Sequence, residues 1–206
     1  MKVLIVHAHP EPQSFTAALR DQAVSTLQEQ GHAVQVSDLY AMQWNPVASA
    51  ADFSTRENPD YLVYALEQRL GVKKQSIAAD IQAELDKLLW ADLLILNFPI
   101  FWFSAPAMLK GWIDRVLVSG VCYGGKRFYD QGGLAGKRAL VTVTLGGREH
   151  MFGEGAIHGP LERAIAAKAS RPSFTAAARC TWPICVRPST PLARGWCRST
   201  ARARAR

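Results

Sequence analysis

An aromatic run, Phe101, Trp102 and Phe103, is the first feature of this sequence that suggests a ligand site. It follows the apolar residues 93–97 and precedes a stretch with helical spacing at residues 106–118. Large aromatic side chains usually fill the core of a protein, and taken alone the run is better explained in that way. At the end of a strand, however, the same side chains would form a flat surface suited to a planar ligand.

Two further segments favour the ligand interpretation. Ser14, Phe15 and Thr16 stand at the start of an expected helix, where free backbone N–H groups and hydroxyls suit a phosphate. Gly146 and Gly147 follow an expected strand, and their missing side chains would let the main chain approach a planar ring. The chain has no GxGxxG fingerprint, which argues against a standard dinucleotide site. Together, the three segments favour a flavin over a nicotinamide held alone.

Strands and helices must bring these segments together. Helical spacing predicts helices at residues 15–30, 61–70, 77–90 and 106–118, the last with Ser104 as its N-cap. Apolar runs predict strands at residues 2–8, 33–37, 93–97 and 138–144. Strands that alternate with helices predict an α/β, doubly wound parallel sheet, whose ligand site lies beyond the carboxyl ends of the strands. Because the three segments follow three such strand ends, we expect them to converge.

Length and composition predict one domain of a cytoplasmic protein. The chain has 206 residues, of which 49% are hydrophobic, and this is enough for a single core. Its first apolar run, residues 3–6, is too short for a signal peptide or a membrane anchor, so no membrane insertion is expected. Four cysteines form no CxxC pair and have no histidines at metal spacing, which predicts no metal site and no structural disulfide.

The net charge of +7 comes from the C-terminal part of the chain. Residues 1–162 contain all 17 acidic residues and 14 of the 24 Lys and Arg, a balance of −3, whereas residues 163–206 contain the other 10 basic residues and no acidic one. Residues 163–206 also contain four prolines and show no apolar periodicity. We therefore expect a flavin-binding domain at residues 1–162 and an atypical, poorly ordered tail rich in Pro and Arg at residues 163–206.

Four motifs resemble those of a known family. The segments are LIVHAHPEPQSF, SDLYAMQWNP, ADLLILNFPIFWFSAPAMLKGWIDRV and GGREHMFGEGAIHG, and they span most of residues 1 to about 160. Their order and spacing are similar to those of the NAD(P)H quinone oxidoreductases of the DT-diaphorase type. This resemblance implies a flavodoxin-like fold with strand order 2-1-3-4-5 and a homodimer that binds FAD, or FMN in some relatives. It also implies a ping-pong reaction, in which a hydride passes from NADH or NADPH to the flavin and then to a quinone in the same pocket.

The resemblance assigns roles to individual residues. The flavin diphosphate and its linker would be held by His9, Gln13, Ser14, Phe15 and Thr16. The ring would be lined by Pro99, Ile100, Phe101, Trp102 and Phe103, and approached from its other end by Thr144, Leu145, Gly146 and Gly147. The quinone pocket, shared with the partner subunit, would contain Tyr123, Gly125, Phe128, Met151, Phe152 and His158. His158 would donate a proton to the forming hydroquinone, and the amides of Gly146 and Gly147 would stabilise charge on the reduced ring.

The chain departs from the family in two places. Phe152 stands where the animal enzymes have the tyrosine of a proton relay, and a phenylalanine donates no proton. Either His158 would then work with water, or the amides of Gly146 and Gly147 alone would stabilise the charge. After residue 164 we find neither the fifth strand nor the last helix of the family, and we expect both to be absent or altered, through a shifted reading frame or a diverged terminus. His7 is expected to be a strand residue without a chemical role.

Two other functions stay open. Some relatives are ancillary subunits of potassium-efflux transporters, and this chain would then have a transporter as its partner. The arginines of the tail suggest nucleic-acid binding by their charge. Since the tail contains no recognisable binding motif, we expect no nucleic-acid partner.

Overall fold

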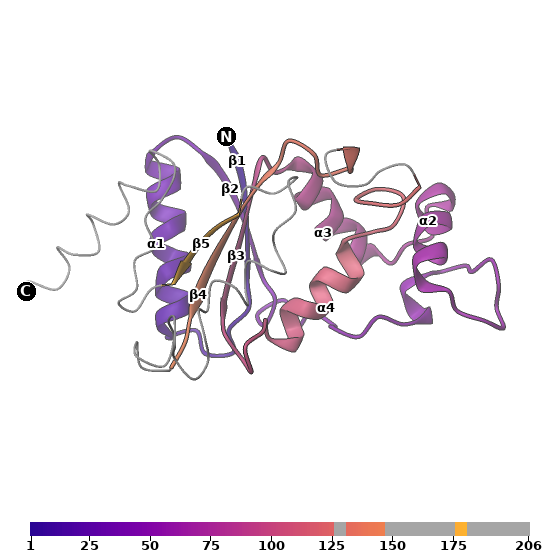
Figure 1. Cartoon of the computed structure of the whole chain (residues 1–206), viewed down its shortest axis with the longest axis horizontal. Helices are drawn as coiled ribbons and strands as arrows, with labels where there is room; N and C mark the ends of the chain where they lie inside the picture. Colours follow the sequence, from indigo (N-terminus) through magenta and orange to yellow (C-terminus); the bar gives the residue numbers. More distant parts are fainter. Residues whose placement is uncertain (126–130, 147–175, 181–206) are drawn as a thin grey trace, which may run out of the picture.

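A parallel sheet organises the fold. The computed structural model describes residues 1–125, 131–146 and 176–180. Its strands are hydrogen-bonded in the order β2-β1-β3-β4-β5 (Figure 1). Their bounds are Lys2–His7 for β1, Ala33–Asp38 for β2, Leu93–Pro99 for β3, Arg138–Thr144 for β4 and Ala176–Cys180 for β5. The doubly wound α/β class predicted from the sequence and the strand order implied by the family resemblance are both confirmed.

The fifth strand is present. It pairs in parallel with β4, with Ala176 level with Ala139 and Cys180 level with Val143. The sequence predicts that this strand is absent or altered. Because the structure contains it, the prediction that it is absent is wrong. The run AAARC lacks the β-branched and aromatic residues typical of strands, so pairing with the apolar β4, and not its own propensity, gives it this conformation. The expected last helix, the rest of the tail and the expected boundary at residue 162 lie outside the described residues.

Parallel pairing brings the carboxyl ends of β1, β3 and β4 to one edge of the sheet, which we call the carboxyl edge. Asn97 of β3 is level with His7 of β1 on one side and with Thr142 of β4 on the other. The carboxyl edge is the lower edge of the sheet in Figure 1. The chain leaves it at the three segments that the sequence predicts to converge.

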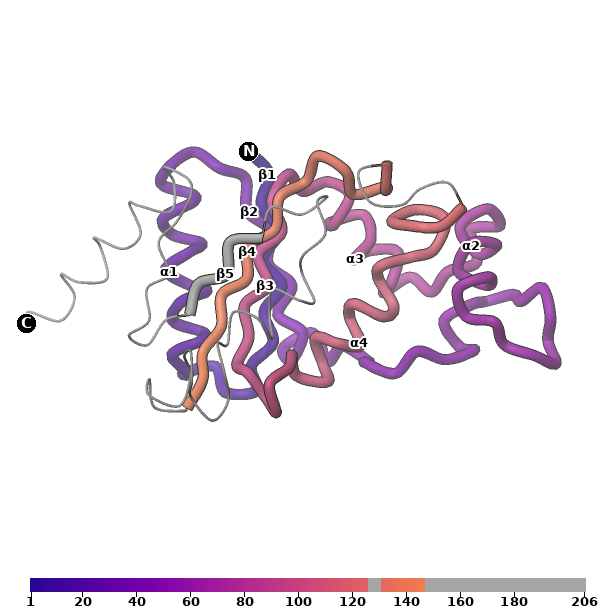
Figure 2. Tube along the Cα trace, viewed as in Figure 1, coloured from indigo at the N-terminus to yellow at the C-terminus, as the bar shows by residue number. Residues whose placement is uncertain are grey.

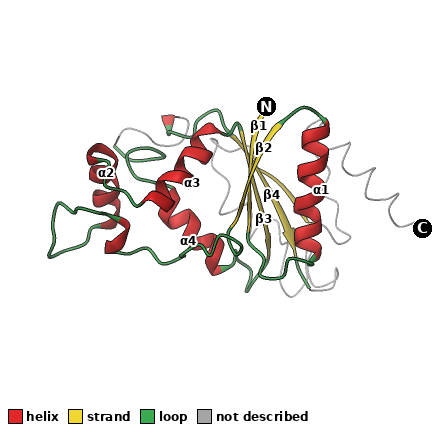
Figure 3. Cartoon of the chain, turned by 180° about the vertical axis from the view of Figure 1, so that it is seen from behind, coloured by secondary structure: helices red, strands yellow, loops and turns green. Residues whose placement is uncertain are grey.

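Helices cover both faces of the sheet (Figure 3). On one face lies α1 (Phe15–Glu29), over a small buried cluster of Val3, Ile5, Ala23, Leu27 and Ile95. On the other face lie α3 (Ala79–Trp90) and α4 (Ala107–Val116), and α2 (Tyr64–Lys74) lies farther from the sheet than either. In the described part of the chain, no helix combines the length and the apolar character needed to cross a membrane.

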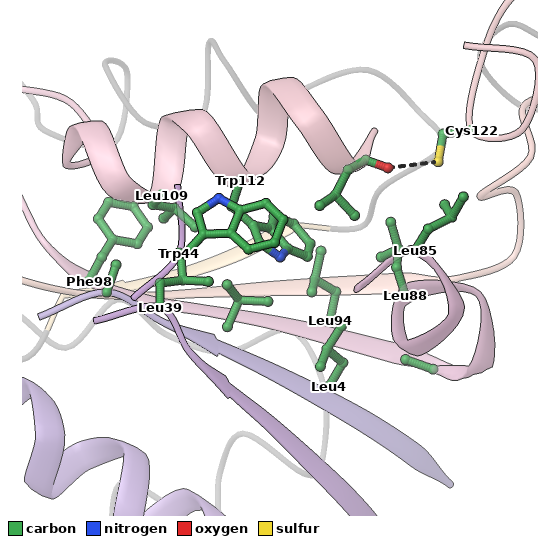
Figure 4. Packing of buried hydrophobic residues seen from close by; sticks show 14 of the residues in the cluster. Leu4, Leu39, Trp44, Leu85, Leu88, Leu94, Phe98, Leu109, Trp112 and Cys122 are labelled. Carbon is green, nitrogen blue, oxygen red and sulfur yellow. Dashed lines mark hydrogen bonds between the residues drawn. The ribbon is translucent and has the colours of Figure 1, made fainter. Parts of the chain in front are cut away.

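The larger core lies between the sheet and the helices α3 and α4 (Figure 4). Trp112 of α4 is its largest fully buried side chain, and the indole N–H donates to the buried Glu84 carboxylate of α3 at 2.8 Å. At the border of this core, the Cys122 sulfur lies 3.8 Å from the Val116 carbonyl oxygen. Burial raises the pKa of the Cys122 thiol to about 11.

The helix α2 begins three residues later than the predicted helix at residues 61–70, and it ends four residues later. Asn58 explains the late start, because its side-chain oxygen accepts the backbone N–H groups of Asp60 and Tyr61 and holds them in a turn. The buried Glu67 carboxylate of α2 in turn accepts the backbone N–H groups of Glu57 and Asn58. These side-chain contacts fix the chain before the helix.

Arg115 of α4 joins three parts of the chain. Its guanidinium contacts Asp52 and Asp80, each at 2.8 Å, and donates to the Asn45 carbonyl oxygen at 2.9 Å. The Arg115 Cζ atom also lies 4.6 Å from the centre of the Trp44 ring. Burial alone would lower the pKa of Arg115, but the two carboxylates outweigh it and raise that pKa. The buried cation is therefore fully paired.

Candidate functional site

The loop after β1 leads into the amino terminus of α1 and offers backbone donors to an anion. Ser14 is the N-cap, and its hydroxyl oxygen accepts the Ala17 N–H at 3.1 Å. Within the described part of the chain, the N–H groups of Phe15 and Thr16 have no hydrogen-bond partner. No acidic residue occupies the first turn of the helix. These donors at the positive end of the helix dipole fit the phosphate group predicted for this position.

His9 adds a side-chain donor to the same loop. The Glu11 N–H donates to His9 Nδ1 at 2.9 Å, and the Glu11 carbonyl oxygen lies farther from the same atom, at 3.2 Å; the shorter contact favours the neutral ring with its proton on Nε2. The Gln13 N–H donates to the Glu11 carboxylate at 2.8 Å. His9 thus has the tautomer that donates to an anion, whereas Gln13 contributes its backbone to the shape of the loop.

Thr16 has a role that the sequence does not reveal. Its hydroxyl lies 2.7 Å from the Thr144 hydroxyl, and the residue is only 1% exposed. This hydrogen bond joins the start of α1 to the end of β4. The Thr16 side chain therefore holds two elements of the carboxyl edge together, and its backbone N–H is the group left for a ligand.

The aromatic run forms an exposed turn after β3, which we call the aromatic turn. Phe101 and Ser104 exchange two backbone hydrogen bonds of 3.0 Å, and the residues between them, Trp102 and Phe103, have left-handed φ angles of 48° and 59°. Trp102 is 95% exposed, and Phe101 and Phe103 are 46% and 44% exposed, so the interpretation as core is wrong for these three residues, whereas Phe98, which precedes them on β3, is part of the core. The turn also explains why Pro106, and not the predicted Ser104, is the N-cap of α4.

The backbone fixes the aromatic turn to the neighbouring strand. The Ile100 N–H donates to the Thr144 carbonyl oxygen at 2.8 Å, while Pro99 is buried and Ile100 half-buried. The Trp102 N–H has no hydrogen-bond partner among the described residues. The predicted ring-lining residues therefore divide into a buried base and an exposed aromatic surface with a donor available to a ligand.

The loop after β4 is described as far as Gly146. Thr144 and Leu145 are half-buried, and Gly146 is exposed. A Cβ atom added at Gly146 would meet no described atom within 4 Å. The described residues thus leave room next to this main chain for the close approach of a planar ring that the sequence predicts. Gly147 lies outside the described residues.

Two of the residues predicted for the quinone pocket, Tyr123 and Gly125, belong to the described part of the chain. The loop after α4 that contains them lies on the side of α2, well away from the carboxyl edge (Figure 2). Neighbouring Gly124 lies against Arg69 of α2, because an added Cβ would be 3.0 Å from the Arg69 Nη2 atom. Tyr123 is 41% exposed, and its entry into a partner subunit's pocket stays a prediction. The other predicted pocket residues lie outside the described residues: Phe128, Met151, Phe152 and His158.

A buried polar chain that sequence analysis missed lies beneath the carboxyl edge. His7 Nδ1 and Asn97 Oδ1 are 2.5 Å apart, and Asn97 Nδ2 donates to Thr142 Oγ1 at 2.9 Å. All three residues are less than 10% exposed. The sequence does contain a sign of this contact, since His7 and Asn97 are polar residues inside apolar strands. A buried polar side chain needs a hydrogen-bond partner, so each of them predicts one nearby.

Burial lowers the pKa of His7, and this effect exceeds the opposing effect of the hydrogen bond with Asn97. The positive charge of Arg20 acts in the same direction as burial, and the negative charge of Asp38 opposes it. His7 is therefore neutral at neutral pH. In the described residues, no group of three or more His, Cys, Asp or Glu side chains is placed to hold a metal ion.

Comparison with known proteins extends this description to a family. A family model for the flavodoxin-like fold matches residues 1–170. A human protein named ribosyldihydronicotinamide dehydrogenase (quinone) is 47% identical over 159 residues, which are 77% of this chain and 69% of the human one. A guinea pig (Cavia porcellus) protein named NAD(P)H dehydrogenase (quinone) 1 is 40% identical over 161 residues, 78% of this chain and 58% of its own length. A solved structure from Klebsiella pneumoniae, assigned as a quinone reductase, is 35% identical, with a TM-score of 0.83, and the match covers 98% of this chain and 83% of that one.

Proposed function

Because this chain belongs to the flavodoxin-like fold family and, within it, to the NAD(P)H quinone oxidoreductases, we propose that it is a flavin-dependent enzyme that transfers a hydride from a dihydronicotinamide to a quinone. The observation that carries this proposal is the aromatic turn. Its three consecutive aromatic side chains are exposed together beside a strand end, with Trp102 95% exposed, and a contiguous exposed apolar surface of this kind is typical of a binding site.

The loop after β1 would hold the phosphate part of the flavin. The backbone N–H groups of Phe15 and Thr16 and the Nε2–H of His9 supply donors for the negative charge. Ser14 keeps the start of the helix in place by accepting the Ala17 N–H. FAD and FMN both present such a phosphate, and FAD is the form that we propose here.

The aromatic turn and the loop after β4 would hold the ring. When bound, the flavin supplies the hydride chemistry, because it accepts a hydride from one substrate and passes it to the next. The protein contributes the aromatic surface of Phe101 to Phe103, the Trp102 N–H as a donor to the ring edge, and open main chain at Gly146. The hydrogen bond between Ile100 and Thr144 keeps the two loops at a fixed separation.

The names of the relatives suggest which hydride donors to compare. The human relative is named for ribosyldihydronicotinamide, and the guinea pig relative for NAD(P)H. Both donors share the dihydronicotinamide ring, so we propose that this ring is what the site recognises. We also propose a cytoplasmic homodimer that follows a ping-pong order, with His158 as the proton donor to the quinone. Neither the described structure nor the relatives above favour the ancillary transporter role.

The test is anaerobic absorption spectroscopy of the purified protein after incubation with FAD or FMN. We expect bound flavin to bleach on addition of NADH, NADPH or ribosyldihydronicotinamide, and to regain its colour on addition of menadione. Bleaching by a donor before any quinone is present would support the ping-pong order. A protein that binds neither flavin, or a bound flavin that no dihydronicotinamide reduces, would contradict the proposal.

A substitution at His9 tests the site itself. His9→Leu removes the Nε2–H donor, and the loss of a hydrogen bond to a charged group predicts a rise in the flavin Kd of about tenfold or more. His32→Leu is the matched control, because His32 lies at the opposite edge of the sheet, within hydrogen-bond distance of the N-terminal amine. Equal flavin Kd values for the two variants would argue against a phosphate at the start of α1.

A further inference from the structure

With the Asn97 amide oriented as in the structure, the hydrogen bonds of the buried polar chain of His7, Asn97 and Thr142 determine where the His7 proton lies. Thr142 Oγ1 lies 3.5 Å from the Leu96 carbonyl oxygen, to which its O–H donates, and it accepts from Asn97 Nδ2. The Asn97 Oδ1 atom must then accept from His7, which requires the proton on His7 Nδ1. The neutral ring therefore has a bare lone pair on Nε2, and this buried atom has no partner in the described part of the chain.

This buried polar chain takes one residue from each of β1, β3 and β4, the three strands that precede the proposed flavin loops. Directly above it, the Ala8 N–H donates to the Asn97 carbonyl oxygen at 3.0 Å, one residue before His9. Two residues beyond Thr142, the Thr144 hydroxyl contacts Thr16 of α1. A side-chain link between His7 and Asn97 thus lies at the base of the phosphate loop and of the aromatic turn together.

We propose that His7 is a positioning residue of the flavin site, which holds the loops of the carboxyl edge only while its ring is neutral and its proton is on Nδ1. This inference rests on the proposed function, because the loops it positions are those proposed to bind flavin. Uptake of a proton by Nε2 would place a buried N–H donor where no acceptor is described. The ring would have to move toward water, and its bond to Asn97 would be lost.

The charges around His7 favour the neutral form. The positive charge of Arg20, on α1, lowers the pKa of His7. The negative charge of Asp38, on β2, raises it, but Asp38 is paired with Arg20 at 2.7 Å. His9, in the loop after β1, also acts to lower the pKa of His7. The folded state takes up a proton at His7 less readily than the unfolded state does. The His7 contribution to the free energy of unfolding is therefore fully present above about pH 6.5, the histidine pKa of the unfolded state, and is lost as the pH falls below that value. The same acidification should loosen the flavin loops.

Two variants separate positioning from titration. His7→Asn keeps an amide N–H donor at the position of Nδ1, which contacts Asn97, but cannot take up a proton, whereas His7→Leu removes the donor as well. His32→Asn is the matched control at the opposite edge of the sheet. We would measure the FAD Kd by fluorescence between pH 8 and pH 5, as well as amide hydrogen exchange in residues 8–14 and 100–104 of the flavin-free protein.

The wild-type FAD Kd should rise about tenfold for each pH unit below the point at which His7 takes up its proton, since only the neutral fraction binds. The His32→Asn control should retain this rise in FAD Kd, and His7→Asn should lack it. His7→Leu should bind FAD weakly at every pH. In ¹⁵N-histidine-labelled protein, the His7 resonances should show the Nδ1–H form. An Nε2–H form, or a His7→Asn profile that matches the control, would overturn the inference.

Failure of the proposed function gives a different pattern. If no flavin binds, that function is wrong, but hydrogen exchange of the loops still shows whether His7 positions them. Acid-induced exchange that is present in the control and absent in His7→Asn would then support positioning without flavin. If flavin binds with the same pH dependence in both variants, the function stands and the role of His7 is wrong.

Discussion

Among single residues, Arg115 shows how a buried charge can be tolerated. It is 3% exposed, and its partner Asp52 is 2% exposed. The Tyr64 hydroxyl also donates to Asp52, at 2.6 Å, so the carboxylate has several donors. Burial opposes the charged form of Asp52, but the hydrogen bonds from Arg115 and Tyr64 outweigh it and lower its pKa. A buried ion pair of this kind is tolerated only while all its partners are present, because the removal of one leaves an uncompensated buried charge.

Substitution of Arg115 should therefore destabilise the protein strongly. Arg115→Met fills similar space but leaves the buried Asp52 carboxylate without its cation, and we expect a loss of about 3–5 kcal/mol in the free energy of unfolding. Urea denaturation followed by far-UV circular dichroism measures this loss. Lys110→Met on the same helix is the control, because the Lys110 pair with Asp114 is exposed and should contribute less than about 1 kcal/mol. Similar losses in both variants would show that burial does not control the effect.

At the scale of elements, the aromatic turn combines backbone strain with an exposed surface. Two consecutive residues with side chains, Trp102 and Phe103, adopt φ angles that favour glycine. Hairpin turns of this hand usually contain Asn or Gly at these positions. Strain that is retained beside a binding surface suggests that the side chains are needed for a purpose other than stability.

The variant Trp102→Gly should separate stability from binding. We expect the free energy of unfolding to rise by about 1 kcal/mol, because the strain is relieved and the exposed indole contributes little packing. The flavin Kd should rise by about two- to tenfold through loss of the aromatic contact. Thermal unfolding and flavin titration measure the two effects. Gln43→Gly is the control, since Gln43 is exposed and has a φ angle of 53° outside the site: it should gain stability without a change in flavin Kd.

The elements also show what local sequence can and cannot predict. The strand at residues 138–144 was predicted with its observed bounds, because a buried parallel strand is a plain apolar run. The start of α2 was not, since it depends on hydrogen bonds from the Asn58 side chain. β5 was missed because pairing with β4, and not residue type, makes it a strand.

The candidate site follows the same distinction. The three loops were predictable, because each follows an apolar strand and carries an unusual composition. The contacts between them were not, because the Thr16 bond to Thr144 and the His7 bond to Asn97 join residues 128 and 90 positions apart. Only the strand order and register bring such pairs together.

On the scale of the whole molecule, the strand order predicts a gradient of stability. β1 and β3 have a hydrogen-bonded strand on both sides, whereas β2 is at an edge of the sheet. Residues 3–7 of β1 are fully buried, while most of β2 is half-buried or exposed. Local opening should therefore be easier in β2 than at the centre.

Amide hydrogen exchange checks this gradient. We expect the amides of β1 and β3 to exchange last, with rates that approach those of global unfolding, and those of β2 to exchange at least about tenfold faster. Peptide-resolved mass spectrometry of the native protein gives the order. Equal protection of β2 and β1 would indicate that another part of the protein covers the β2 edge.

The burial of Cys122 has a consequence for an enzyme that handles quinones. Quinones are electrophiles that arylate thiolates by conjugate addition, so a reactive cysteine would expose the enzyme to modification by its own substrate. With a pKa of about 11, the Cys122 thiol is ionised in only about one molecule in ten thousand at pH 7, and its sulfur faces a carbonyl oxygen inside the core. Burial of Cys122 in the native fold therefore protects this thiol from arylation by quinones over many catalytic cycles.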